Sequence, residues 1–240
     1  MTTDDVFTSL RDFGEANTNP AIVEKYAKYF KEGYDAYGLN KEQVNGKVKE
    51  ILSLPGITQD FILDTSLVLV KSPKYEMTVI AIQLVLGFQK SWTAGVFKTV
   101  ESWFSVGITN WAQTDYICGE LMNLFFKKKL IGLQSIELWR SASNKFQRRA
   151  AVVSLIKPMK HSADFSPFYN FIEPMMHDPA REVHQGLGWF LRETWKKQPL
   201  PAEAFLLKFK ETSPRLIFQY ATEKMTKEGK DRFRRGNCKS

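Results

Sequence analysis

The chain has 240 residues, of which 43% are hydrophobic and 25% charged, and its formal net charge is +8. This composition is typical of a globular protein and excludes general disorder. The charge is uneven, because residues 1–90 carry a net −2 and residues 91–240 a net +10. The asymmetry indicates an anionic partner for the later part of the chain, although a solvated basic surface has the same composition.

Apolar residues recur at intervals of three and four, the spacing of amphipathic helices. We predict helices, in chain order, over residues 21–31, 43–54, 59–70, 75–88, 95–105, 110–127, 132–142, 146–157, 165–175, 180–197, 202–210 and 213–227. Residues 78–86 are rich in Val and Ile, as strands are, but their length and lack of alternation favour a buried helix. No two neighbouring segments have the pattern of a hairpin, so the chain is expected to be all-α.

Turn-forming residues separate these segments and indicate where helices begin. Asn19-Pro20, Ser72-Pro73 and Asp178-Pro179 each combine a capping side chain with a proline suited to a first helical turn. Paired helices would form units of roughly 35–45 residues, the size of HEAT-like repeats that stack into a curved solenoid. A compact helical bundle fits the periodicity equally well.

Several classes of protein and site do not fit the sequence. The start of the chain is acidic, unlike a signal or transit peptide, and the longest apolar stretch, residues 79–88, is too short to span a bilayer. The two cysteines, Cys118 and Cys238, and the three histidines have no metal-ligand spacing. We therefore expect a cytoplasmic protein without a metal site. No glycine-rich phosphate loop or Gly-x-Ser-x-Gly motif occurs.

Two short motifs in the basic part of the chain could carry chemistry. Trp111 and Asp115 are four residues apart and share a face of a predicted helix, although a core Trp beside an exposed Asp is the simpler interpretation. Arg148 and Arg149 lie near the start of the predicted helix 146–157, where the helix dipole disfavours positive charge. A bound phosphate or carboxylate ligand would offset this unfavourable interaction with the helix dipole, and a surface salt bridge would do the same.

A third motif is the pair Gly186 and Gly188, directly before Trp189. Each glycine inside a helix costs about 1 kcal/mol relative to alanine. The pattern therefore indicates close helix packing or close approach of a ligand. Packing of Trp189 in the core is the commoner explanation.

Taken in order, these motifs resemble those of the AlkD-like DNA alkylation-repair proteins. The shared elements are Trp-x-x-x-Asp at 111–115, Arg-Ala-Ala-Val at 149–152 and Gly-Trp-Phe-Leu-Arg-Glu at 188–193. Residues 34–39 and 72–76 are similar to an early aromatic-glycine turn and a Glu-containing second repeat of that family. The resemblance implies an all-α, HEAT-like helical-repeat solenoid with a concave basic face. We expect one such domain over residues 1–227, followed by a flexible basic tail over 228–240.

The resemblance also implies roles for individual residues. Asp115 matches the carboxylate needed for base excision, and Trp111 and Trp189 match the aromatic residues that flank the damaged nucleotide. Arg149 matches a phosphate-contacting arginine, with Arg148 as its neighbour. Further candidates for contact with the DNA backbone, which are also plausible solvated charges, are Lys127, Lys128, Lys129, Lys145, Lys196 and Lys197.

The implied function is a DNA glycosylase that excises cationic N3- or N7-alkylated purines from double-stranded DNA. Alkylation weakens the N-glycosidic bond, and a carboxylate can stabilise the oxocarbenium-like sugar and orient the attacking water. Indole rings favour cations and can pack against the sugar. A cationic leaving group needs no general acid, and no cofactor is implied. The protein is expected to act as a monomer, away from membranes.

One departure from the family keeps other functions open. Active relatives commonly have Trp-Trp-Asp-x-x-Asp where residues 110–115 have Asn-Trp-Ala-Gln-Thr-Asp, so the first Trp and the first carboxylate are missing. Phe146 also stands where a Trp is frequent. The first alternative is a noncatalytic protein that binds distorted or branched DNA. The second is a helical-repeat scaffold for protein partners.

Overall fold

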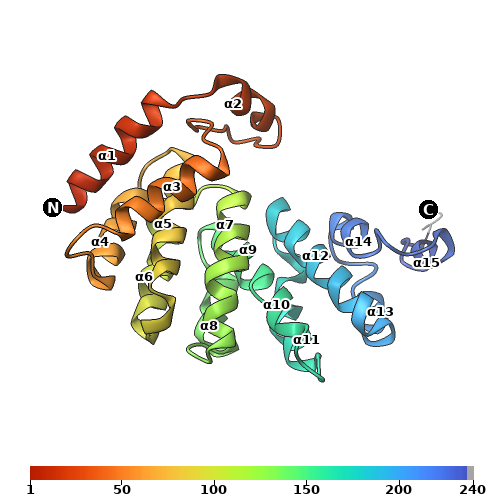
Figure 1. Ribbon diagram of the computed structural model, residues 1–240. Helices are drawn as coiled ribbons and strands as arrows, with labels where there is room; N and C mark the ends of the chain where they lie inside the picture. Colours follow the sequence, from red (N-terminus) through yellow and green to blue (C-terminus); the bar gives the residue numbers. More distant parts are fainter. Residues whose placement is uncertain (237–240) are drawn as a thin grey trace. The chain divides into compact units, whose positions relative to one another are not determined.

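The computed structural model describes residues 1–236, which form helices and no strand (Figure 1). The all-α prediction is confirmed. Residue contacts divide the chain into two compact units, Met1–Leu121 and Met122–Ser240, whereas the sequence predicts one domain over residues 1–227. Cys238 lies outside the described residues.

The first unit contains seven α-helices, a 3₁₀ turn and the start of a π-helical segment. Their bounds are α1 (Thr3–Ala16), α2 (Pro20–Ala27), α3 (Lys41–Leu52), α4 (Gln59–Val70), α5 (Tyr75–Gly87), η1 (Gln89–Ser91), α6 (Ala94–Val106), α7 (Trp111–Ile117) and the π-helical η2 (Cys118–Met122). The division between the units falls inside η2.

Side-chain caps explain where many helices of the first unit begin. The Asn19 side chain accepts a hydrogen bond from the Ile22 amide, and Pro20 occupies the first turn of α2, as the sequence predicts. The unpredicted helix α1 begins at a capping box of Thr2 and Asp5. This capping box can be recognised in the sequence from Thr2 and Asp5. The acidic start of the chain is therefore helical.

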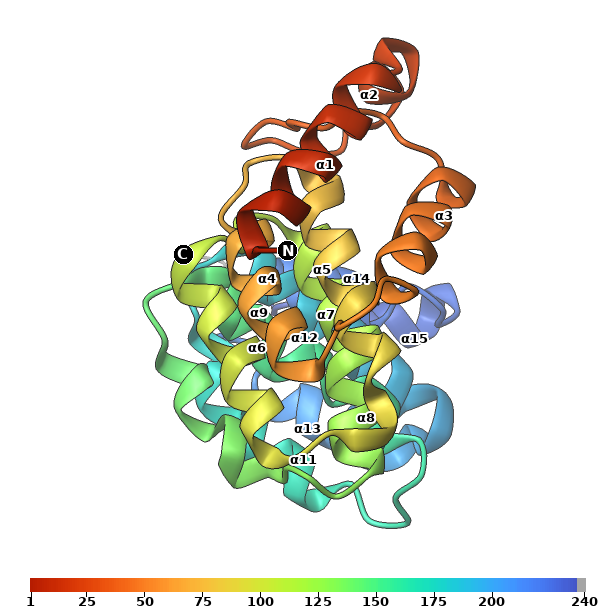
Figure 2. The ribbon, with the colours of Figure 1, turned by 60° about the vertical axis from the view of Figure 1, so that its left-hand side comes forward.

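The core of the first unit lies around α4 and α5. Helix α4 contacts α1, α5 and α6, and α5 also contacts α3 and α7 (Figure 2). Apolar residues surround most of the circumference of α5, where Ile80, Ala81, Ile82 and Leu84 are at most 1% exposed. The Val/Ile-rich segment is therefore a buried helix, as its length and lack of alternation predict.

The second unit contains eight α-helices and two 3₁₀ segments within its described residues. Their bounds are α8 (Asn123–Lys127), η3 (Leu133–Ser141), α9 (Lys145–Val153), α10 (Ile156–Met159), α11 (Ser166–Ile172), η4 (Glu173–His177), α12 (Arg181–Lys197), α13 (Pro199–Lys208), α14 (Arg215–Ala221) and α15 (Lys227–Asp231). Helix α12 is central, because it contacts α9, α10, α13 and α14.

Several predicted α-helices differ from the observed elements, three of them for clear local reasons. The segment 110–127 is α7, η2 and α8 in succession, with a π turn in the middle. The segment 132–142 is 3₁₀, and its buried residues Ile136 and Trp139 are three apart, the period of that helix. The segment 165–175 changes from α11 to 3₁₀ geometry at Pro174, which has no amide hydrogen to donate.

Part of the predicted tail, residues 228–240, contacts the rest of the second unit. Residues 227–231 form α15, and Phe233 is 1% exposed. The Arg232 side chain forms an ion pair with Glu203 of α13 at 2.6 Å, and Arg215 of α14 donates to the Phe233 carbonyl. Burial of the Phe233 ring and these contacts hold residues 227–233 against α13 and α14, and the flexibility of the tail stays a prediction.

Candidate functional site

Helix α7 carries two of the predicted site residues, and buried polar contacts hold its first turn against α5. The Asn110 side chain caps the helix by accepting from the Gln113 amide at 2.9 Å. The buried Gln113 side chain accepts from the Thr109 amide and donates to the Thr78 hydroxyl of α5 at 2.9 Å. Asn110, at the position of the family's missing Trp, therefore has a structural role as a cap.

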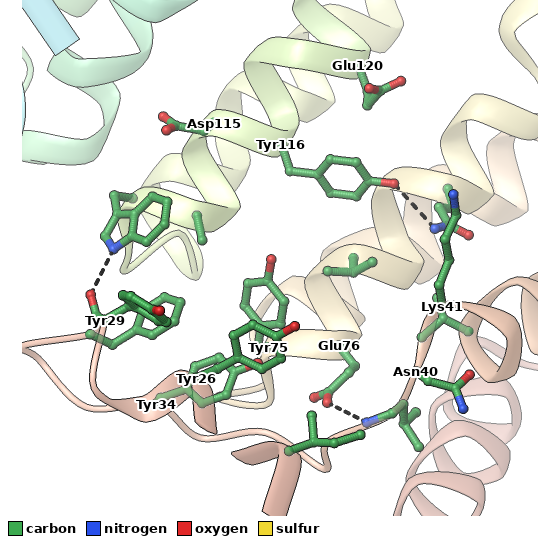
Figure 3. A pocket seen from close by; sticks show the side chains of 18 residues that line it. Tyr26, Tyr29, Tyr34, Asn40, Lys41, Tyr75, Glu76, Asp115, Tyr116 and Glu120 are labelled. Atoms are coloured by element: carbon green, nitrogen blue, oxygen red, sulfur yellow. Dashed lines mark hydrogen bonds between the residues drawn. The ribbon is translucent and has the colours of Figure 1, made fainter. Parts of the chain in front are cut away.

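Trp111 and Asp115 lie one turn apart on α7, as their spacing predicts, and both are half-buried. The Trp111 indole stacks on Phe30 with ring centroids 5.5 Å apart and donates to the Tyr29 carbonyl, the bond drawn at Tyr29 in Figure 3. Neither Trp111 nor Asp115 is a fully buried core residue. Both remain accessible to a ligand.

Both side chains line one pocket of about 1110 Å³ in the first unit (Figure 3). Its aromatic lining residues are Tyr26, Tyr29, Phe30, Tyr34, Tyr75, Trp111 and Tyr116. Phe30 is sandwiched between Tyr34, at 4.5 Å, and Trp111. Tyr26 and Tyr29 are the exposed rings, at 42% and 58%.

Part of this lining comes from the segment predicted to be a helix over residues 21–31. Ile22, Val23, Tyr26, Ala27 and Phe30 share one face of that predicted helix, and α2, which ends at Ala27, contains no buried residue. Ile22, Tyr26 and Phe30 instead line the pocket. The signal that could have indicated this is the density of aromatic residues between 26 and 37, which exceeds what a short helix needs for packing.

A buried carboxylate shapes one wall of the pocket. Glu76, 4% exposed at the start of α5, accepts hydrogen bonds from the amides of Tyr37, Gly38 and Leu39 at 3.0, 2.7 and 3.1 Å. Gly38 has a φ of 82°, and a Cβ atom there would lie 2.4 Å from the Asn19 carbonyl oxygen. The two upstream motifs, 34–39 and 72–76, thus meet in space and form one loop-and-helix unit.

The pocket is acidic in a protein that is basic as a whole. Glu76, Asp115 and Glu120 line it, whereas Lys41 is the one basic side chain among the lining residues. Burial raises the pKa of Tyr75 to about 12, and the negative charge of Glu76 and Asp115 adds to this effect. Burial also raises the pKa of Tyr34. Both phenols therefore stay neutral at physiological pH, and the carboxylates determine the sign of the local field.

The two predicted phosphate-binding arginines make internal contacts in the second unit. Arg148 forms a two-point ion pair with Asp178, at 2.6 and 3.3 Å, and also donates to the Ala142 carbonyl. Arg149 is 5% exposed and donates to the Glu182 carbonyl at 2.7 Å. The salt-bridge interpretation therefore describes Arg148 in this structure, and phosphate contact by either side chain stays a prediction.

The predicted lysine contacts fall into two groups. Lys127, Lys128 and Lys129 are exposed at the end of α8, where Lys129 adopts a φ of 57°. They also lie where positive charge stabilises a helix C-terminus. Lys145 is paired with Glu182 at 3.0 Å and Lys196 with Glu193 at 2.8 Å, while Lys197 is exposed.

The glycines before Trp189 serve helix packing. A Cβ atom on Gly188 would lie 2.4 Å from the Tyr220 Cβ and 2.7 Å from the Ile217 carbonyl oxygen of α14. At Gly186 the nearest atom, on Val153 of α9, would be 3.3 Å away. Trp189 itself is half-buried, so it is not a core residue of α12.

The predicted site residues therefore form two groups. Trp111 and Asp115 share a pocket of the first unit, and Arg148, Arg149, Lys145 and Trp189 lie on α9 and α12, which contact each other in the second unit. The predicted convergence of both groups on one basic surface stays a prediction.

The family model described as DNA alkylation repair enzyme matches residues 14–225. The chain belongs to the DNA alkylation repair enzyme family. The match covers both units and every predicted site residue, so the resemblance inferred from the motifs is confirmed. Membership supports a role in DNA alkylation repair.

Solved structures agree with this family assignment at the level of the fold. A predicted DNA alkylation repair enzyme from Enterococcus faecalis has a TM-score of 0.74 and 16% identity, over 88% of this chain and 98% of that one. AlkD2 from Streptococcus mutans has a TM-score of 0.57 and 19% identity, over 87% and 99%. Because these identities are low, they support the helical-repeat fold alone. The comparison with curated proteins gives no match.

Membrane-spanning helices and metal sites are absent from the part of the chain that the structure describes. Among residues 1–236, none of the helices has the length and hydrophobicity of a membrane span. Within the same residues, no group of three or more His, Cys, Asp and Glu side chains is arranged to hold a metal ion.

Proposed function

We propose that this member of the family is a DNA glycosylase that hydrolyses the N-glycosidic bond of cationic N3- or N7-alkylated purines in double-stranded DNA. The observation that carries the proposal is the pairing of Trp111 and Asp115 on one face of α7, both bordering the same pocket. A carboxylate and an indole in this arrangement suit a reaction that develops positive charge on a sugar.

The chemistry follows from the charge of the substrate. An alkylated purine leaves as a neutral base once the bond between C1′ and the base nitrogen breaks, so its departure needs no proton donor. The sugar then carries oxocarbenium character, which the Asp115 carboxylate stabilises while it orients a water molecule. The water adds its oxygen to C1′ and releases a proton to the solvent, and the products are the neutral free base and an abasic sugar.

Side chains of both units supply the predicted DNA contacts. Trp189 would flank the nucleotide, and Arg149 would contact a phosphate, with Arg148 beside it. The exposed Lys127, Lys128 and Lys129 and the paired Lys145 would contribute contacts that do not depend on sequence. The partner is double-stranded DNA, no cofactor takes part, and a cytoplasmic monomer is the expected form.

The experiment is a base-release assay on duplex DNA methylated at guanine N7 and adenine N3. We expect the wild-type protein to release methylated bases and to leave alkali-labile sites. Asp115→Asn should lower the rate by about 100-fold or more, because removing a group that stabilises transition-state charge costs about this much. Duplex binding by this variant should be retained, since the change touches one side chain.

Asp64→Asn is the matched control, because Asp64 is an exposed residue of α4 outside the pocket. It should release bases at the wild-type rate. If wild type leaves both lesions intact over long incubation while binding duplex or branched DNA, the noncatalytic alternative replaces the glycosylase. Asn110 and Ala112, at the positions of the missing Trp and carboxylate, are the observation that favours this alternative.

A further inference from the structure

We infer that helix α12 lies across one groove of the bound duplex, and that basic side chains near its two ends hold the backbones of opposite strands. The cluster around Glu182 holds the strand with the alkylated nucleotide, and the cluster around Glu193 holds the complementary strand. The inference rests on the proposed function for its DNA partner. It goes further, because it assigns a contact to the undamaged strand and a role in DNA binding to Lys160.

One face of α12 carries a row of four side chains, those of Glu182, Trp189, Glu193 and Lys196. They follow one another at spacings of seven, four and three residues, which place side chains on the same side of an α-helix. None of the four is buried, whereas the opposite side of α12 packs in the core of the second unit. The row is therefore accessible along most of the helix.

The C-terminal part of this row gathers positive charge around one carboxylate. Glu193 forms ion pairs with Lys196 at 2.8 Å and with Lys160, the C-cap residue of α10, at 3.6 Å. Arg192 lies between Glu193, at 3.6 Å, and Glu223, which follows α14. These five side chains carry three positive and two negative charges, so the Glu193 cluster is cationic as a whole.

The lysines of the Glu193 cluster are open to an external anion. The Lys160 and Lys196 side chains are 40% and 41% exposed, whereas that of Glu193 is 13% exposed. Burial raises the pKa of Glu193, but the hydrogen bond from Lys196 and the nearby positive charges outweigh this effect and lower the pKa below its ordinary value. A charged carboxylate thus holds two ammonium groups at the surface, where a phosphate can bind both.

The N-terminal part of the row has a similar arrangement. Glu182 forms an ion pair with Lys145 of α9 at 3.0 Å, and its carbonyl oxygen accepts from Arg149 of the same helix at 2.7 Å. Helix α9 contacts α12. Two basic groups therefore converge on the start of α12, where Arg149 is already the proposed phosphate contact.

The distance between the two clusters suits the two strands of one duplex. Glu182 and Glu193 are eleven residues apart, about 16 Å along the axis of an α-helix, and Trp189 lies between them. The grooves of B-DNA are about 6 and 12 Å wide. Cationic groups at this spacing, on flexible side chains, therefore reach both edges of a groove when the helix lies across it.

The position of Trp189 favours this orientation over one along a single strand. If both clusters contacted the same backbone, the indole between them would face charged phosphates, which are poor partners for an aromatic ring. Across a groove the indole faces sugars and base edges instead. This orientation also agrees with the proposed role of Trp189 beside the nucleotide.

The lysines at the ends of α10 and α12 have a second possible role, because positive charge stabilises a helix C-terminus. That role needs no DNA and leaves the salt dependence of DNA binding unchanged. Phosphate contact, in contrast, contributes to that salt dependence in proportion to the number of phosphates neutralised. Salt dependence therefore separates the two roles.

The first test measures, by fluorescence anisotropy, binding to a duplex with 7-methylguanine on a 2′-fluoro sugar, which resists cleavage. Lys160→Gln combined with Lys196→Gln should make the slope of log affinity against log salt shallower by about 1, the value for one lost phosphate contact. Lys208→Gln is the matched control, because Lys208 also pairs with a glutamate, Glu173, but lies on α13. It should leave the slope as in wild type.

A second double variant separates charge from packing. Lys160→Arg combined with Lys196→Arg keeps both positive charges and should have the wild-type slope. An unchanged slope in the Gln double variant would overturn the inference and leave the lysines with the helix-stabilising role. Equal loss of slope in the Gln and Arg double variants would also overturn it, since charge would then not be the cause.

The second test identifies the strand. In one hybrid duplex the complementary strand has neutral methylphosphonate linkages, and in the other the lesion strand has them. With the complementary strand neutral, wild type and the Gln double variant should have equal slopes, because the contacted phosphate has lost its charge. With the lesion strand neutral, the difference between them should remain. A difference that survives neutralisation of the complementary strand would overturn the inference, since the lysines would then contact the lesion strand.

These outcomes are separate from those of the base-release assay. Strand-specific effects without base release would support the two-strand contact and refute the glycosylase. Base release with an unchanged slope in the Gln double variant would support the glycosylase and refute the two-strand contact. Failure of the wild-type protein to bind any duplex at low salt would refute both.

Discussion

Glu76 connects sequence motifs that are almost 40 residues apart. Its buried carboxylate accepts three backbone N–H bonds from residues 37–39, and the Tyr75 amide donates to the Asp35 carbonyl at 2.8 Å. Hydrogen bonds to a charged acceptor are stronger than those between neutral groups. One side chain therefore fixes the loop that forms a wall of the aromatic pocket.

Glu76→Gln should destabilise the first unit by about 2 kcal/mol. The glutamine amide can accept bonds through its oxygen, but its NH₂ group would face the amides that Glu76 now satisfies, leaving buried donors unpaired. The measurement is equilibrium unfolding in urea, monitored by circular dichroism. Glu24→Gln, an exposed change of the same type, should alter the free energy of unfolding by less than about 0.5 kcal/mol.

Equal stabilities for these two variants would mean that the carboxylate charge contributes nothing to holding the loop. The loop would then depend on Gly38 and on the Lys74 side chain, which pairs with Asp35 at 2.6 Å. The pocket wall would be expected to survive the loss of Glu76.

At the scale of elements, α12 packs closely against α14 at Gly188. Gly188 faces α14 so closely that a Cβ atom would overlap the Tyr220 side chain and approach the Ile217 backbone. Helix backbones rarely come this near, and a side chain at the crossing would force them apart. The propensity cost of a glycine inside α12 is therefore offset by packing between α12 and α14.

Gly188→Ala should destabilise the protein by about 2–3 kcal/mol, because overpacking forces shifts in a close-packed region that includes backbone. Gly46→Ala is the control, and its expected effect on stability has the opposite sign. Gly46 lies in the interior of α3, where an added Cβ atom would have no neighbour within 4 Å. It should stabilise the protein by about 0.5–1 kcal/mol, and thermal unfolding of both variants checks the pair.

If Gly188→Ala were as stable as wild type, α12 and α14 would be able to separate without loss, and the contact would not be a structural constraint. The alternative interpretation of the glycine pair, close approach by a ligand beside Trp189, would then gain support.

At the scale of the whole molecule, the charge follows the division into compact units. Residues 1–121 carry 11 basic and 15 acidic side chains, a net −4, and residues 122–240 carry 23 and 11, a net +12. The acidic pocket lies in the first unit, and the exposed Lys127–Lys129 cluster lies in the second. The carboxylate proposed to act on the sugar and the lysines proposed to contact the DNA backbone thus lie in different units of the chain.

Replacing Lys127, Lys128 and Lys129 together by Gln should weaken duplex binding for all sequences alike. If each lysine neutralises one phosphate, the slope of log affinity against log salt should become shallower by about 2–3. Fluorescence anisotropy over a series of salt concentrations measures this slope. The charge-matched control replaces Lys49, Lys71 and Lys90, three exposed lysines of the near-neutral part, and should leave the slope close to that of wild type.

A slope that changes equally in both triple variants would show that net charge alone governs binding. A slope that changes only in the control would move the predicted DNA contact to the first unit.

Local signals in the sequence determined the helical class, most helix positions and the family. Asn19-Pro20 begins α2, the apolar run at 78–86 is buried in α5, and Trp111 and Asp115 share a turn of α7, because capping, periodicity and spacing act within a few residues. The motif order from residue 111 to residue 193 identified the family for the same reason.

The tertiary structure decided what depends on residues distant in the sequence. Only packing places Tyr26 and Phe30 in a pocket with Asp115, joins Glu76 to residues 37–39, and buries Phe233 against its neighbours. A helical face of apolar residues looks the same in sequence whether it meets a core or a cavity. The choice between the two is made by the side chains that pack opposite it, and those come from elsewhere in the chain.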